Sequence, residues 1–252
     1  MNLFAGRFFL WLSGLAALAL LISLGVWQLH RRDWKAGIIA KIERSLTEQP
    51  APYIPPPAND AEDTEREFKP VHIEGTLLRE NSFKELVPAP ESMRAFTKEG
   101  FGYLIFSPLN FGSGIVFINR GFVPASLADG YLKGAPEPAA VTGLIRITQP
   151  PGWFTPAAEI GTRTFYTADI PAMASNASLP KERVVFGEYI EANATANEGG
   201  WPKGRDPKSL LAIVPNRHFE YALTWFGFAV GLTGVFIAYL RSGRNRRRFA
   251  QH

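Results

Sequence analysis

The chain has 252 residues, no cysteine and a formal net charge of +4, and 46% of its residues are hydrophobic and 13% aromatic. The absence of cysteine excludes disulfides, thiolate metal sites, iron–sulfur clusters and cysteine nucleophiles, and the aromatic content excludes a chain that is disordered as a whole. The positive charge lies at the ends, because residues 30–217 are nearly neutral whereas five arginines fall within residues 241–248. A basic run beside an apolar segment is more typical of a membrane surface than of nucleic-acid binding, so we expect no nucleic-acid partner.

Two long apolar segments predict a membrane protein. Residues 8–29 carry no charge, and a helix of that length, at about 1.5 Å per residue, is long enough to cross the hydrocarbon core. Residues 219–240 form a second such segment with one acid, Glu220, near its edge. The first segment ends in bulky residues rather than in a small-x-small cleavage site, so we expect a retained anchor and not a cleaved signal peptide.

These segments predict five regions in chain order. They are a cytoplasmic N-terminus (1–7), a first transmembrane helix (8–29), a periplasmic β-rich domain (30–217), a second transmembrane helix (218–240) and a basic cytoplasmic tail (241–252). Basic residues close to the two segments are almost equally numerous on both sides, so the expected orientation depends on the arginines of the tail.

The region after the first segment begins as a helix. Apolar residues share one helical stripe, so we expect the membrane helix to continue outward and to pack on the domain. They are Trp34, Ile38, Ile39, Ile42 and Leu46. Prolines within residues 50–57 end this helix. The acidic residues 60–67 are expected to form a solvated loop, with a strip that docks a partner as the alternative.

Alternating apolar residues then predict a β-rich domain. Val71, Ile73 and Leu77 point one way along their strand, and two apolar runs around Gly112-Ser113-Gly114 indicate a hairpin. The expected strands are 71–78, 101–111, 114–123, 141–148, 163–170 and 183–192. Strands in this number with few helices predict an α+β membrane protein in which the two helices flank a barrel- or sandwich-like domain. In the second segment, Gly227, Gly231 and Gly234 form a small-residue face on which the first helix is expected to pack.

The residues that carry chemistry lie at the membrane edges. No histidines have metal-ligand spacing, and Ser178 and Lys181 form an SxxK match without its companion motifs, so we expect no enzyme. An aromatic belt explains Trp27, Trp34 and Tyr221. It explains Gln28, Asn216, His218 and Glu220 less well, because polar and ionisable groups near the hydrocarbon are costly and tend to mark function.

Three stretches together resemble the surfeit-locus family of cytochrome c oxidase assembly factors. They are LGVWQLHRRDWK (24–35), GSGIVFINRGFVP (112–124) and NRHFEYALTWFG (216–227). The second is similar to a family run that ends in Asn-Arg-Gly-aromatic-Val-Pro, with Phe122 where the family often has Trp. The third is similar to the pattern Asn-x-His-x-x-Tyr-Ala-x-x-Trp-aromatic-Gly.

The resemblance implies a protein of the bacterial inner (plasma) membrane that helps to mature subunit I of a heme-copper oxidase. Its implied partners are that subunit, heme a synthase and the lipid bilayer. Its implied cofactor is heme a, with His218 as the iron ligand and Arg31, Arg32 or Arg217 beside the propionates. The implied cofactor-binding residues are His218, Asn216, Arg217, Trp27, Gln28, Arg31, Tyr221 and Trp225.

Several alternatives stay open from the sequence. His218 can instead be an interfacial histidine held by hydrogen bonds, and His30, at the end of the first segment, is the next candidate ligand. The protein can also be a heme-free scaffold for assembly intermediates, and its client can be a quinol oxidase.

Overall fold

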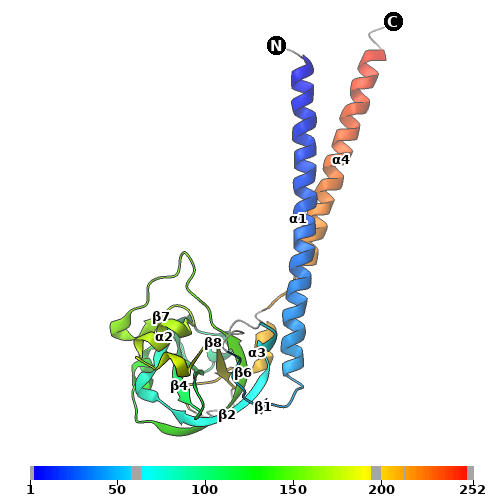
Figure 1. Cartoon of the computed structure of the whole chain (residues 1–252). Helices are drawn as coiled ribbons and strands as arrows, with labels where there is room; N and C mark the ends of the chain where they lie inside the picture. The colour runs from blue at the N-terminus through cyan, green and yellow to red at the C-terminus, as the bar shows by residue number, and fades with distance from the viewer. Residues whose placement is uncertain (1–2, 58–63, 194–199, 213, 249–252) are drawn as a thin grey trace. The chain divides into compact units, whose positions relative to one another are not determined.

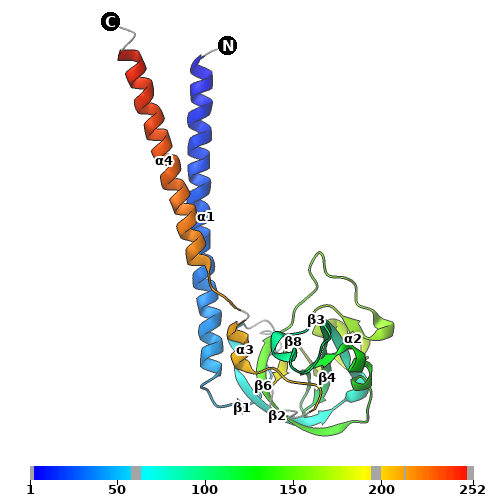
Figure 2. The same cartoon turned by 180° about the vertical axis from the view of Figure 1, so that it is seen from behind.

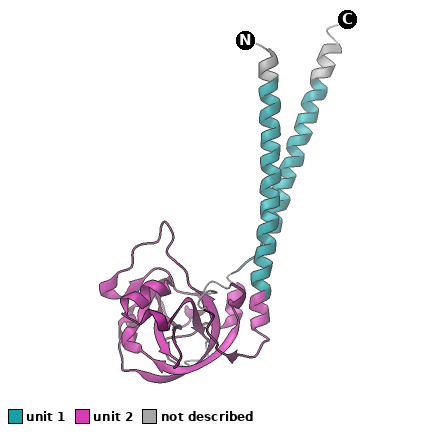
Figure 3. Cartoon of the chain, in the orientation of Figure 1, with its two compact units in different colours: residues 1–40, 214–252 teal, residues 41–213 magenta. Residues whose placement is uncertain are grey.

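The computed structural model describes residues 3–57, 64–193, 200–212 and 214–248, with side chains described between residues 8 and 242 of these ranges. The chain divides into two compact units, residues 1–40 with 214–252 and residues 41–213 (Figure 3). Its α-helices and strands, in chain order, are α1 (Leu3–Ser45), β1 (Ala51–Pro52), β2 (Pro70–Leu77), β3 (Phe83–Pro88), β4 (Phe101–Asn110), β5 (Ile115–Pro124), β6 (Glu137–Ile147), β7 (Thr164–Phe165), α2 (Ile170–Asn176), β8 (Val184–Ala192), α3 (Pro207–Ala212) and α4 (His218–Arg248).

The first unit is a pair of long helices that lie side by side (Figures 1 and 2). α1 continues without a break from the first apolar segment to Ser45, so the predicted outward extension of the membrane helix is confirmed. Both helices are long and apolar enough to cross a membrane, over Phe8–Ser45 and His218–Ser242. Many of their large apolar side chains are exposed, an arrangement that suits lipid and not water.

The two helices pack through glycines of α1. A Cβ atom on Gly14 would overlap the ring of Phe236, and a Cβ atom on Gly25 would overlap the ring of Phe226. The prediction that the glycines of α4 face α1 is wrong, because nothing lies within 4 Å of where their Cβ atoms would be: Gly227, Gly231 and Gly234. Small residues permit close approach, but here the phenylalanine rings of α4 fill the space that the α1 glycines leave.

Replacing Gly25 by leucine is therefore expected to loosen the helix pair. The added side chain would overlap the Phe226 ring, and overpacking of this kind costs about 1–3 kcal/mol. We expect a lower midpoint of thermal unfolding in detergent. Gly231→Leu is the matched control on an open face, and a loss there as large as at Gly25 would contradict the packing described.

Five strands of the second unit close into a barrel. The sheet order is β1-β2-β6-β8-β5-β4-β3-β7, and β2 also pairs with β4 through Thr76–Asn110 and Leu77–Leu109. In the resulting ring, β5 pairs with β8 in parallel and the other four pairings are antiparallel. Numbered along the chain, the ring runs 1-2-3-5-4, which is the strand order of the OB-fold barrel. The closed ring resolves the sequence alternatives in favour of a barrel.

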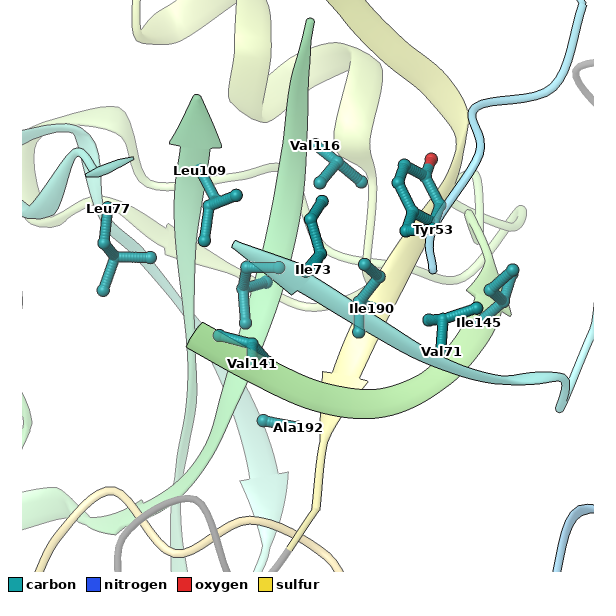
Figure 4. Packing of buried hydrophobic residues seen from close by; sticks show 11 residues of the cluster. Tyr53, Val71, Ile73, Leu77, Leu109, Val116, Val141, Ile145, Ile190 and Ala192 are labelled. Carbon is teal, nitrogen blue, oxygen red and sulfur yellow. The ribbon is translucent and has the colours of Figure 1, made fainter. Parts of the chain in front are cut away.

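Alternate residues of the strands fill the barrel interior. Val71, Ile73 and Leu77 are buried in it, as the period of two predicted. Figure 4 shows them with Val116 and Ile190 from β5 and β8. The opposite faces of β4, β5 and β8 carry a second buried cluster, which includes residues of α2.

Most of the predicted strands are confirmed, including the β4–β5 hairpin. The predicted strand 163–170 is mostly wrong, since β7 covers only Thr164–Phe165 and α2 begins at Ile170. Asp169 caps that helix by accepting the Ala172 amide at 3.1 Å, and a proline in the first turn favours the same start. Of the acidic stretch, residues 60–63 lie outside the described residues, and Thr64–Arg66 form a 3₁₀ turn.

A buried carboxylate network lies on the outer face of the barrel. The Glu191 carboxylate lies 2.7 Å from Nη1 of Arg146 and 3.2 Å from Nε of Arg205. Burial, and after it the negative charge of Glu191, raises the pKa of Glu85 from 4.5 to about 7, although Arg205 and Arg146 act in the opposite direction.

This raised pKa predicts that the barrel becomes less stable as the pH rises from about 4.5 to about 7. In that window the folded state holds a proton on Glu85 that the unfolded state has released. The free energy of unfolding that is lost by about pH 8 is on the order of 3 kcal/mol. Glu85→Gln should flatten this dependence in unfolding midpoints measured at several pH values, and Glu80→Gln, at an exposed position, is the control. An unchanged slope in Glu85→Gln would contradict the assignment.

Candidate functional site

α1 carries two adjacent stripes of functional side chains where it leaves the apolar segment. Residues spaced i, i+4 and i+7 share one face of a helix. One stripe consists of Gln28, Arg32 and Lys35, and the other of Trp27, Arg31 and Trp34.

Residues of the first stripe form hydrogen bonds with residues 215–218, where α4 begins. His218 Nδ1 lies 2.7 Å from Gln28 Oε1. Asn216 Nδ2 donates to the Arg32 carbonyl at 2.9 Å, and Lys35 Nζ donates to the Pro215 carbonyl at 3.0 Å. The start of α4 is therefore attached to α1 at three successive points on one face.

The contact with Gln28 selects the tautomer of His218. The amide oxygen can only accept, so Nδ1 of the neutral imidazole carries the proton and Nε2 keeps its lone pair. A histidine that binds a metal through one ring nitrogen typically donates its other N–H to a neighbouring acceptor of this kind. His218 is half-buried, so the ring is both oriented and accessible.

Asn216 adds an unused acceptor beside this histidine. Its Oδ1 atom is buried and has no hydrogen-bond partner among the described residues. Buried polar atoms are nearly always paired, so this oxygen is available to a donor from outside the described residues.

The second stripe is a flat cationic and aromatic surface. The Arg31 guanidinium carbon lies 5.6 Å from the ring centroid of Trp27 and 5.2 Å from that of Trp34. The two tryptophans are 49% and 56% exposed. Arg31 is thus held between two rings by cation–π contacts while its charge stays available at the surface.

The structure brings only some of the predicted site residues together. His218, Gln28 and Asn216 share the contacts described above, with Trp27 and Arg31 on the adjacent stripe. Two of the others form separate contacts: Arg217 lies 3.5 Å from Glu220, and Trp225 packs on Phe228 at 6.1 Å between ring centroids. Tyr221 is 58% exposed.

Two partners in the site were not predicted from the sequence. They are the backbone carbonyls of Arg32 and Pro215, which accept the side chains of Asn216 and Lys35. The shared spacing of residues 28, 32 and 35 was the available signal for a common face.

The site offers one histidine to a metal. In the part of the chain that the structure describes, no three His, Asp or Glu side chains are grouped to hold a metal ion. A metal bound through His218 would thus need its other ligands from outside these side chains. A heme iron meets this condition, because the porphyrin supplies its remaining nitrogen ligands.

Comparison with known proteins gives a consistent family. The model of the SURF1 family matches residues 15–230. The SURF1-like protein of Monosiga brevicollis is 28% identical over 88% of this chain and 84% of its own length. Surfeit locus protein 1 of Homo sapiens is 28% identical over 82% of this chain and 69% of its own length, and that of Arabidopsis thaliana is 24% identical over 88% and 75%. A match that covers most of α1, the barrel and the first turns of α4 shows that this chain belongs to the SURF1 family.

Proposed function

We propose that this protein is a membrane-anchored assembly factor for a heme-copper terminal oxidase, and that it binds heme a and assists its insertion into subunit I. The assembly role is supported by the family match over residues 15–230. The observation that carries the heme role is the contact of His218 Nδ1 with Gln28 at 2.7 Å, because it leaves the lone pair of Nε2 available to bind a metal.

The residues around His218 suit a flat, anionic, largely apolar ligand. His218 Nε2 would bind the heme iron through the lone pair of the neutral imidazole. Arg31 would pair with a propionate, and the Trp27 ring offers an apolar wall. The Asn216 Oδ1 atom is an acceptor for a further polar group.

The exposure of these side chains favours a role in transfer over one in storage. Trp27, Trp34 and Tyr221 are all about half exposed or more. A ligand at this surface would therefore be covered on one side by the helix pair and on the other by lipid or a partner protein. Such a ligand can leave without local unfolding of the chain.

The proposal includes an orientation in the bacterial inner membrane. Cytoplasmic termini and a periplasmic barrel are favoured by the arginines of residues 241–248, since basic residues near a span stay in the cytoplasm. A reporter that is active only in the periplasm should be silent when fused at the C-terminus and active when inserted after Gly130 in the barrel unit. Activity at the C-terminus would reverse the orientation.

Deletion of the gene tests the assembly role. We expect lower oxidase activity and less heme a in assembled subunit I, while the total heme a synthesised by the cell is unchanged. Normal activity per mole of assembled oxidase with a normal spectrum would contradict the role.

An absorbance spectrum of the purified protein tests the heme role separately. Protein from cells that make heme a should carry it. If the protein never carries heme and deletion still lowers oxidase assembly, the protein is a heme-free scaffold.

A further inference from the structure

The barrel has a charged group at each end of its interior, Glu188, which is buried, and Arg120, which is partly buried. Ile118 of β5 pairs with Ile190 of β8 in the middle of the barrel. Because alternate residues of a strand share a face, Val116 and Glu188 lie toward one end of the interior. Arg120 and Ala192 lie toward the other end. The hydrogen bonding of the two ends differs.

The Glu188 end is fully paired. Glu188 is 1% exposed, and its carboxylate accepts the Tyr53 hydroxyl at 2.8 Å and two Arg66 nitrogens at 2.9 Å and 3.0 Å. This network closes that end of the barrel without a ligand.

The Arg120 end is only partly paired among the described residues. One terminal nitrogen of the Arg120 guanidinium, Nη1, is buried and has no hydrogen-bond partner among the described residues, and the same holds for Nε of Arg79. The Glu137 carboxylate lies 3.3 Å from Nη1 of Arg79, and Glu137 lines the same cavity as Arg120. An unpaired buried donor on a charged group is costly.

The local chain geometry holds Arg120 in this position. Asn119 Oδ1 accepts the Gly121 amide at 3.0 Å, and Gly121 has a φ of +114°. A Cβ atom at Gly121 would overlap the backbone of Lys203. The Asn-Arg-Gly run therefore forms a fixed irregularity within β5, where the pairing with β4 shifts register, and Arg120 is its central residue.

A cavity of about 290 Å³ opens beside Arg120. Short side chains leave this space, among them Ala139, Ala140 and Ala192 on β6 and β8. Its size is at the lower end of pockets that take small molecules.

Electrostatics at this end favour an anion. Burial, and after it the positive charge of Arg79, lowers the pKa of Arg120, and Glu137 offsets this only in part. Two cations near each other in a partly buried place repel, and a bound anion would relieve both this repulsion and the unpaired donors.

We infer that this end of the barrel is a binding site for a small oxyanion, a carboxylate or phosphate group, held by Arg120, with the positive charge of Arg79 adding to the attraction. The oxyanion is either free or part of a lipid headgroup. The site belongs to the barrel unit and is independent of the heme proposal.

The test uses the full chain in detergent, with inorganic phosphate as the probe and chloride at equal ionic strength as the reference. Phosphate should raise the midpoint of thermal unfolding of the wild type in a concentration-dependent way. Arg120→Met should abolish this rise, and Arg120→Lys should weaken apparent phosphate binding about tenfold or more, since a lysine cannot reproduce the forked donors. Arg94→Met, at an exposed position, is the matched control and should keep the full response.

The midpoints of thermal unfolding measured in chloride show whether Arg120 serves a ligand or the stability of the fold. In chloride, Arg120→Met should unfold at or above the wild-type midpoint, because it removes a buried cation with an unpaired donor. A large drop in both Arg120 variants would show that Arg120 serves only the fold, and would overturn the inference.

A lipid arm identifies the source of the oxyanion. The same variants are compared in nanodiscs of phosphatidylcholine with and without phosphatidylglycerol. A rise that requires both phosphatidylglycerol and Arg120 assigns the site to a lipid headgroup, and a rise with inorganic phosphate alone assigns it to a free anion. No Arg120-dependent rise in either arm would overturn the inference.

Discussion

Replacement of His218 by alanine is expected to abolish heme binding while the protein stays inserted and folded. The iron would lose its protein ligand, so the Soret band should disappear, or shift if another ligand replaces imidazole. His218 is half-buried, and its side chain is hydrogen-bonded to Gln28. Its truncation should therefore cost less than about 1.5 kcal/mol of stability. The measurement is heme per polypeptide at equal protein level, together with the unfolding midpoint.

Two further variants make this result specific. Gln28→Ala removes the acceptor that orients His218 Nδ1, and loss of such a partner typically weakens metal binding by about 10- to 100-fold. His30→Ala removes an exposed histidine two residues further along α1 and should leave heme binding unchanged. The three variants together separate loss of the ligand, loss of its orientation and loss of an unrelated histidine.

Other outcomes would reassign the site. If His218→Ala keeps full heme stoichiometry with an unchanged spectrum, His218 is an interfacial residue held by its hydrogen bond. If His30→Ala loses heme instead, His30 is the ligand. Equal loss in all three variants would point to disruption of the helix pair.

The fold was predictable where local pattern and tertiary environment agree. β2 and the β4–β5 hairpin follow the alternation of apolar residues, because each has one face in the barrel. β3 was missed because Lys84 and Glu85 interrupt its pattern. Lys84 is 7% exposed and pairs with Asp129, which is distant in sequence, so no local signal could indicate its burial.

The candidate site was predictable in its residue types but not in its pairings. The polar residues at the membrane edges indicated Gln28, Asn216 and His218 as unusual. Which of them meet depends on how α4 lies against α1, and that is decided by Phe226 and Phe236 over Gly25 and Gly14. The glycines of α4 gave a plausible but wrong contact face, since small residues show where a helix can pack and not where it does.

The buried Glu188 network is expected to be the most sensitive point of the barrel. Replacing Glu188 by alanine would leave Tyr53 and Arg66 without the carboxylate that both contact. Breaking a buried ion pair by removing one partner costs about 3–5 kcal/mol. That is a large share of the stability of a domain, which is typically about 5–15 kcal/mol.

Glu188→Gln should be much milder than Glu188→Ala. The amide keeps the shape and one oxygen acceptor, but it replaces charge-assisted hydrogen bonds by neutral ones, which are roughly half as strong. Denaturant unfolding should therefore rank the proteins as wild type, Glu188→Gln and then Glu188→Ala. Glu182→Ala, at an exposed position just before β8, should match the wild type. A loss below about 1 kcal/mol in Glu188→Ala, well under the cost of an unpaired buried charge, would show that Arg66 and Tyr53 find other partners and that this end of the barrel does not depend on the carboxylate.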